Sequence, residues 1–209
     1  MIFNSNVFLV FLAVVSLLYW LVRHRASHRD RLILAASLVF YGWWVWRFLG
    51  LLMLTGGIDF VCARKIASET APTIRRRWLW LSVITNLGTL GFLKYAGFFV
   101  DSAATLLGHL GIPVSLPTLQ IVLPAGISFY TFQALSYTVD VYRGQVAAEP
   151  NLVRYFAFLT FFPQLVAGPI ERASFLLPQF REPRVVTQAL MAQGLWLIVW
   201  GFFLKVVIA

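Results

Sequence analysis

The feature that most constrains this chain is a series of apolar runs, each about as long as a helix that crosses a bilayer. Such a helix needs about 20 mostly apolar residues. Hydrophobic residues make up 60% of the 209 residues and charged residues only 12%, whereas about 25% of a soluble domain is charged. A soluble fold of this size could not bury so much apolar surface. The sequence therefore predicts an all-α, polytopic helical membrane protein.

The apolar runs predict a single transmembrane domain over residues 1–209. We expect spans at residues 3–22, 32–46, 48–65, 78–100, 119–141 and 189–209. Leu32–Ala63 is too long for one crossing, because its 32 residues would form a helix of about 48 Å against a hydrocarbon core of about 30 Å. Arg47 follows a cluster of aromatic residues, which favour the headgroup interface. Two short helices joined by a tight outer turn are therefore preferred over one tilted helix.

Residues 155–170 differ from the other apolar runs because Pro163 and Pro169 interrupt them. Proline removes a backbone donor and clashes with the preceding turn of a helix. Freed backbone groups at membrane depth are tolerated only inside protein or beside a hydrated cavity. We therefore expect a re-entrant segment that enters from the cytoplasmic side, with a kinked full span as the alternative.

The distribution of basic residues predicts the orientation. The net charge of +9 also invites a nucleic-acid interpretation, but basic residues in membrane proteins gather in cytoplasmic loops. No Lys or Arg precedes Arg23, which indicates an uncleaved first span with its N-terminus outside. With residues 155–170 re-entrant, 14 of the 17 Lys and Arg residues lie inside; with a full span, 12 do. We expect a multi-pass protein of the cytoplasmic (inner) membrane.

Polar residues within apolar runs are the best pointers to function in such a chain. Tyr130, Gln133, Tyr137 and Asp140 are spaced by three or four residues, so they share one helical face. Gln164 lies between the two prolines of the interrupted run. The sequence predicts either a hydrated substrate tunnel lined by Gln133, Tyr137, Asp140 and Gln164, or a structural network that holds the interrupted segment.

Other polar groups have plainer interpretations. Asp59 follows Gly56 and Gly57, which permit close helix packing, and we expect it near the inner end of its helix, paired with Arg64 or Lys65. Asn86 could hydrogen-bond a neighbouring helix, but such bonds contribute only about 0.6 kcal/mol on average, so a packing role is the default.

The three histidines do not form a recognisable site. His24 and His28 are four residues apart but crowded by arginines, so we expect a solvated basic face. His109 stands alone in a predicted outer loop at residues 101–118. No nucleophile–base arrangement, phosphate-binding glycine loop or metal-ligand spacing occurs, so we predict no metal site and no bound cofactor.

Several motifs resemble the membrane-bound O-acyltransferase family, in particular its alginate O-acetyltransferase branch. The more specific pair is LPAGISFYTFQALSYTVDVYRG at residues 123–144 and FFPQLVAGPI at residues 161–170. The others are LVFYGWW at 38–44, NLGTLGFLKYAGFF at 86–99 and GFFLKVVIA at 201–209. The resemblance implies a ring of transmembrane helices around a central tunnel, of which this chain forms the N-terminal half.

The resemblance also implies a chemistry. An acyl thioester, acetyl-CoA or an acyl carrier, is the co-substrate on the cytoplasmic side, and a hydroxyl acceptor arrives from outside. The alginate branch implies acetyl transfer to mannuronate hydroxyls of an exported polysaccharide, with periplasmic acetyl-transfer partner proteins. A buried histidine acts as general base in the family, in a Trp-His motif beyond the KVVIA stretch. No such motif occurs here, so we assign no catalytic residue and expect an N-terminal fragment that is inactive alone.

Three alternatives remain open on the sequence. D-alanyl transfer or cellulose acylation by a relative of the same family would use the same segments. A transporter also uses broken helices, although it predicts internal repeats that are not found here. A non-catalytic scaffold would only dock partners.

Overall fold

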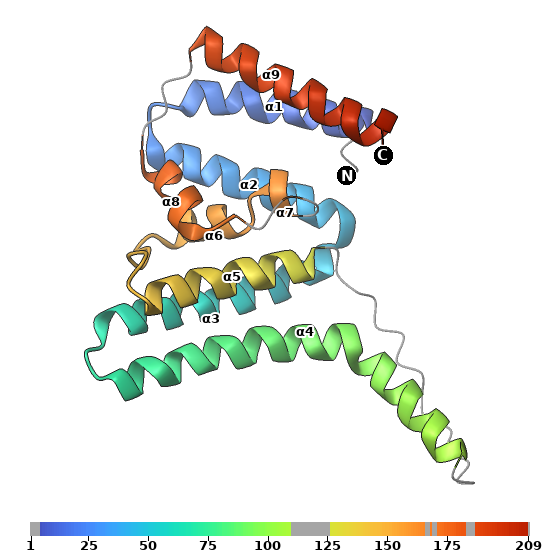
Figure 1. Cartoon of the computed structure of the whole chain (residues 1–209). Helices are drawn as coiled ribbons and strands as arrows, with labels where there is room; N and C mark the ends of the chain where they lie inside the picture. The colour runs from blue at the N-terminus through green and yellow to red at the C-terminus, as the bar shows by residue number, and fades with distance from the viewer. Residues whose placement is uncertain (1–4, 110–125, 166–167, 169–170, 183–186, 209) are drawn as a thin grey trace.

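The structure, a computed structural model, describes residues 5–109, 126–165, 168, 171–182 and 187–208 (Figure 1). All regular elements in these ranges are helical, which confirms the predicted all-α class. The helices are α1 (Asn6–Val22), α2 (Ala26–Val45), η1 (Trp46–Phe48), α3 (Leu49–Ser68), α4 (Pro72–His109), α5 (Ile127–Tyr142), α6 (Leu152–Leu159), α7 (Phe162–Leu165), α8 (Ala173–Arg181), α9 (Gln188–Phe203) and η2 (Leu204–Ile208).

Within the described ranges, three helical stretches are long and apolar enough to cross a membrane: Trp46–Ser68, Pro72–His109 and Gln188–Ile208. Asn6–Val22 and Leu152–Leu165 are shorter apolar stretches. These lengths and compositions support a polytopic membrane protein.

The long helices lie side by side in a layered bundle (Figure 1). Helices α1 and α2 pack together on one side, and α3, α4 and α5 pack together on the other. The short helices α6, α7 and α8 lie between these two groups, where α6 contacts α2, α3 and α5. Together α6, α7 and α8 form what we call the broken segment, residues 152–181.

Most charged residues gather at one end of the bundle, which we call the basic end. Here α1 connects to α2, α3 connects to α4, and α5 ends (Figure 1). The Arg75 guanidinium donates to the Tyr142 carbonyl at 2.7 Å and so ties the start of α4 to the end of α5.

Local sequence explains the helix ends. The Ser5 hydroxyl accepts a hydrogen bond from the Phe8 N–H and caps α1. Pro72 is the first residue of α4, where its missing N–H costs nothing. At the end of α5, Gly144 adopts a φ of 73°, and the N–H groups of Gly144 and Gln145 donate to the Val141 and Asp140 carbonyls. This is a Schellman motif, which requires glycine at the left-handed position.

The helices extend beyond the spans predicted from hydropathy. Helix α2 begins at Ala26 rather than near residue 32, and α4 covers 38 residues rather than only residues 78–100. Arg75, Arg76 and Arg77, expected in a loop, lie in the first turns of α4. Hydropathy marks only the part of a helix that matches the hydrocarbon core, and a helix continues past it wherever its backbone bonds allow.

The predicted outer parts of the chain are only partly described. Residues 101–109 of the expected outer loop are the last turns of α4, and His109 is exposed at its end. Residues 110–118 of that loop and residues 119–125 of the expected span at 119–141 lie outside the described residues. The connection expected near Arg47 is the 3₁₀ turn Trp46–Phe48, where Arg47 is exposed.

Gly56 permits close packing of α3 against α6. A Cβ atom at Gly56 would lie 2.6 Å from Leu159 Cδ2 and 2.8 Å from Phe156 Cε1. At the adjacent Gly57, a Cβ atom would meet nothing within 4 Å. The close packing predicted for this glycine pair therefore depends on Gly56.

This difference predicts that Gly56→Val lowers the melting temperature of the detergent-solubilised protein by about 3–10 °C, because overpacking costs about 1–3 kcal/mol. Gly57→Val is the matched control, since it shares the change in helix propensity and meets no neighbour. Equal melting temperatures for the two variants would contradict the packing of α6 on α3.

Candidate functional site

The broken segment begins with α6, which cannot continue through Pro163. The Leu159 carbonyl would need the N–H group of residue 163, and proline has none. Helix α6 therefore ends at Leu159, where the Thr160 N–H and hydroxyl both donate to the Phe156 carbonyl, at 2.8 and 2.7 Å. All of these residues except Pro163 are buried.

Side chains of α5 and α2 satisfy backbone groups at this break. The Gln133 amide donates to the Phe158 carbonyl at 3.0 Å, and the Phe162 N–H donates to the Ser37 hydroxyl at 3.2 Å. Buried backbone groups must be paired, most of all at membrane depth. Gln133 and Ser37 thus stabilise the broken segment directly.

Tyr137 fixes the approach to the segment. The Glu149 N–H donates to the Tyr137 hydroxyl at 2.9 Å. The Tyr137 ring packs against that of Tyr155 in α6, with ring centroids 5.1 Å apart. Both tyrosines are fully buried, so this part of the predicted polar face serves packing and loop attachment together.

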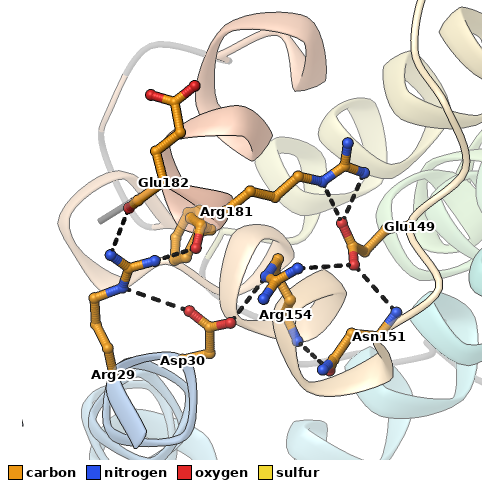
Figure 2. A network of polar contacts seen from close by, with 8 residues as sticks. Arg29, Asp30, Glu149, Asn151, Arg154, Arg181 and Glu182 are labelled. Atoms are coloured by element: carbon orange, nitrogen blue, oxygen red, sulfur yellow. Dashed lines mark hydrogen bonds and ion pairs between the residues drawn. The ribbon is translucent and has the colours of Figure 1, made fainter. Parts of the chain in front are cut away.

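A network of ion pairs holds the two ends of the broken segment at the basic end (Figure 2). The Arg154 guanidinium lies between two buried carboxylates, 2.9 Å from Asp30 and 3.4 Å from Glu149. The Arg181 guanidinium lies 2.8 Å from the other Glu149 oxygen. Because Arg154 lies in the first turn of α6 and Arg181 ends α8, the chain returns to the end of the bundle at which it entered.

Arg29 completes this network from α2. Its guanidinium donates to the Glu182 carbonyl at 2.7 Å and to the Phe180 carbonyl, so it caps the end of α8. It also lies 3.7 Å from Asp30. Residues 26–31 precede the span predicted from residue 32 but are helical, and Arg29 and Asp30 are both 1% exposed. The physical reason is that their charges pair with distant backbone and side-chain groups.

Gln164, predicted as a tunnel residue, lies in α7 and is buried. Its side-chain nitrogen has no hydrogen-bond partner within the described part of the chain. Its carbonyl accepts from the Gly168 N–H at 3.0 Å. A Cβ atom at Gly168 would lie 2.5 Å from Gln164 Cα, so the turn after α7 requires glycine. Pro169 lies outside the described residues.

Two cavities adjoin these elements. The larger, about 520 Å³, is mostly apolar and lies between α1, α2, α9 and the broken segment, with Pro163 and Arg29 in its wall. The smaller, about 350 Å³, lies at the basic end of α5 and includes Asp140. Of the four predicted tunnel residues, Gln133 and Tyr137 contact the broken segment or the loop before it, Gln164 lies within it, and Asp140 faces the smaller cavity.

Asp59 belongs to a separate buried cluster between α3 and α4. The Asn86 amide donates to both of its carboxylate oxygens at 2.8 Å, and the Ser82 hydroxyl donates to one at 2.5 Å. The expected pairing with Arg64 or Lys65 is wrong, because Asp59 points into the α3–α4 interface. Asn86, for which packing was the default interpretation, forms an interhelical hydrogen bond to Asp59.

The histidines lie apart from these groups. His24 and His28 are exposed, as predicted for a solvated basic face. Among the described residues, no group of three or more His, Cys, Asp and Glu side chains is placed to hold a metal ion.

Sequence reasoning missed the ion-pair network. The rarity of acidic residues could have indicated this network, because only 8 occur in the chain. Asp30 and Glu149 are two of them, and their sequence neighbours are mostly basic or apolar. Their partners could not be identified from spacing, since Asp30 and Arg154 are 124 positions apart.

Comparison with known proteins agrees with the sequence motifs. The chain is 42% identical over its whole length to a protein of Azotobacter vinelandii named "Probable alginate O-acetylase AlgI", of which it covers 42%. It is equally identical to the Pseudomonas aeruginosa protein of that name, of which it covers 40%. The chain is therefore similar along its whole length to proteins named alginate O-acetylase.

The relationship reaches beyond that group. A protein of Helicobacter pylori named "Peptidoglycan O-acetyltransferase" is 30% identical along the whole chain, which covers 44% of it. The chain spans about two fifths of the length of the curated relatives it matches. No family model matches the chain, and no solved structure matches it. The predicted resemblance to alginate O-acetyltransferases is confirmed by these relatives.

The ion-pair network predicts that Arg154→Gln lowers the free energy of unfolding by about 3 kcal/mol, because it leaves two buried carboxylates short of a partner. Thermal unfolding in detergent measures the loss. Arg76→Gln, which removes an exposed guanidinium from α4, is the control and should change stability by less than about 0.5 kcal/mol. A stability loss no larger than that of the control would show that the network contributes nothing.

Proposed function

We propose that this chain forms part of a membrane-embedded O-acetyltransferase that moves an acetyl group across the cytoplasmic membrane to acetylate an exported polysaccharide, alginate. The observation that carries this proposal is 42% identity, along the whole chain, to proteins named alginate O-acetylase. The proposed acceptor groups are mannuronate hydroxyls, presented with periplasmic partner proteins.

The proposed reaction is acyl transfer from a thioester. The donor, acetyl-CoA or an acyl carrier, approaches from the basic end, and the hydroxyl acceptor approaches from the opposite end. The hydroxyl oxygen attacks the thioester carbonyl, a carbon–oxygen bond replaces the carbon–sulfur bond, and the thiol leaves with the proton that a general base removes from the hydroxyl. No residue described here is assigned as that base.

In this proposal the broken segment forms a wall of the passage for the acetyl group. Helix α6 does not extend across the bundle, so the barrier is thinner than a full-length helix would make it. Gln133 and Tyr137 position this wall by binding the Phe158 carbonyl and the Glu149 N–H. Gln164 has a buried amide nitrogen with no hydrogen-bond partner among the residues that the structure describes, so it can donate to a passing carbonyl. Asp140 lies near the end of α5, where it lines the smaller cavity.

The proposed orientation follows from charge. The basic end faces the cytoplasm, since positive residues are retained on that side, and the N-terminus lies outside. Both ends of the broken segment bond to the start of α2 at the basic end. This geometry supports a re-entrant segment at residues 155–170 rather than a kinked span.

A second acceptor is supported by the relative named "Peptidoglycan O-acetyltransferase". D-alanyl transfer and cellulose acylation have no such relative among those reported above. A transporter or scaffold function likewise has no support from these relatives.

The direct test expresses the complete gene product in an alginate-producing strain whose own alginate O-acetylase has been deleted. We expect acetyl esters to reappear on the alginate, measured by NMR of the purified polymer. Acetylated peptidoglycan with unmodified alginate would instead favour the second acceptor. An unmodified polymer and cell wall, with the protein present in the membrane, would contradict the proposal.

Gln133→Leu in the same strain is expected to lower alginate acetylation at least tenfold, with the membrane level of the protein unchanged. The reason is that the Phe158 carbonyl loses the hydrogen bond from the Gln133 amide, so the broken segment is no longer held in position. Gln188→Leu, at an exposed position that starts α9, is the matched control and should retain activity. If Gln133→Leu retained acetylation, the proposal that Gln133 positions the broken segment as a wall of the acetyl passage would be wrong.

A further inference from the structure

Asp140 is a mostly buried residue whose carboxylate faces a cavity and has no partner in the part of the chain that the structure describes. It is 8% exposed, and within the described ranges it forms no hydrogen bond through its side chain and no ion pair. Its carboxylate faces the cavity of about 350 Å³ at the end of α5. The carboxylate oxygens are reached from this cavity, so a ligand bound there can supply a cation or strong donors to a side chain that is otherwise mostly buried.

The same cavity carries two guanidinium groups. Arg143 immediately follows α5, and Arg172 immediately precedes α8; both are exposed and line the cavity. Neither forms an ion pair or a side-chain hydrogen bond with any described residue. Guanidinium groups bind phosphate oxygens well because of their planar donor geometry. The cavity therefore combines an anion-binding rim with a buried anionic wall.

The rest of the cavity lining is mixed, and its apolar residues follow one face of α5. Phe132, Leu135 and Val139 line it together with Ser136 and Gln145. From Phe132 to Arg143 the helix rises about 16 Å, since each residue adds 1.5 Å. The charged groups thus lie at the basic end, and the apolar side chains extend from there toward the middle of the bundle.

We propose that this cavity binds an aminophospholipid with a primary amine, such as phosphatidylethanolamine. The ammonium group donates to Asp140, the phosphate binds Arg143 and Arg172, and an acyl chain lies on Phe132, Leu135 and Val139. This site goes beyond acetyl transfer, and its depth in the membrane rests on the orientation proposed above, which puts the basic end at the level of the phospholipid headgroups.

The charge pattern distinguishes this ligand from the alternatives. A free phosphate or a thioester donor with several phosphates would bind the two arginines but would be repelled by the Asp140 carboxylate. A choline headgroup carries a positive charge but no N–H donors, so it cannot hydrogen-bond Asp140. A glycerol headgroup carries no cation. Of these headgroups, a phosphate joined to a primary ammonium is the one that can bind both the two arginines and the Asp140 carboxylate.

The test reconstitutes the full chain in nanodiscs with equal amounts of phosphatidylethanolamine, phosphatidylcholine and phosphatidylglycerol, and identifies retained lipids by native mass spectrometry. We expect enrichment of phosphatidylethanolamine on the wild-type protein. Asp140→Asn should lower its preference over phosphatidylcholine about tenfold, because the bond to a charged group is lost. Asp140→Glu should retain most of the preference. The Arg143→Gln/Arg172→Gln double variant should lose all bound phospholipids.

The matched controls remove the same charges elsewhere. Arg76→Gln/Arg77→Gln removes two exposed arginines of α4, and Asp101→Asn removes an exposed carboxylate; both should retain the wild-type lipid pattern. Retained lipids in proportion to the nanodisc composition, or an unchanged preference in Asp140→Asn, would overturn the proposal. Displacement of the lipid by acetyl-CoA or by inorganic phosphate alone at millimolar concentration would also overturn it, because either would identify an anion site instead.

Discussion

The pairing of backbone groups at a proline-interrupted helix is the constraint on which the rest of this structure depends. In a membrane no water is available to bind freed N–H and C=O groups. Helix α6 ends before Pro163, and side chains from two other helices compensate: Gln133 binds the Phe158 carbonyl, and Ser37 accepts from the Phe162 N–H. The polar residues of α5 and α2 are therefore part of the same structural solution as the break itself.

The ion-pair network extends this solution to the ends of the broken segment. Arg29, Asp30 and Arg154 connect α2 to the start of α6 and the end of α8, and Glu149 joins Arg154 to Arg181. Buried ion pairs add little net stability compared with apolar packing, but they define one geometry and disfavour others. In this chain that geometry brings residues 152–181 back to the basic end. A segment held in this way can form a thin, fixed wall, which is the role that the proposed acetyl transfer requires.

Much of the architecture was predictable, for identifiable reasons. The apolar runs predicted the helical class, and Arg47 after its aromatic cluster marked the connection between α2 and α3. The three- and four-residue spacing of Tyr130, Gln133, Tyr137 and Asp140 predicted a shared face, and all four are buried. That spacing could not tell that Gln133 and Tyr137 bind backbone groups while Asp140 faces a cavity. The roles of Asp30 and Glu149 depend on partners that are distant in the sequence. Asp59 accepts hydrogen bonds from Ser82 and Asn86 and does not pair with the nearby Arg64 or Lys65. Helix ends were misjudged because α2 and α4 continue beyond their apolar cores.

The central claim is that the broken segment enters and leaves the membrane on one side. It is tested most directly by single cysteines at Pro150 and Glu182, both exposed and flanking the segment, in the presence of the fully buried Cys62. A membrane-impermeant maleimide is applied to right-side-out and inverted vesicles, with a cysteine at the exposed Ser68 as the reference for the basic end. The account predicts that both positions are labelled from the same side as Ser68. Labelling of Pro150 and Glu182 from opposite sides would show that the segment spans the membrane and would contradict it.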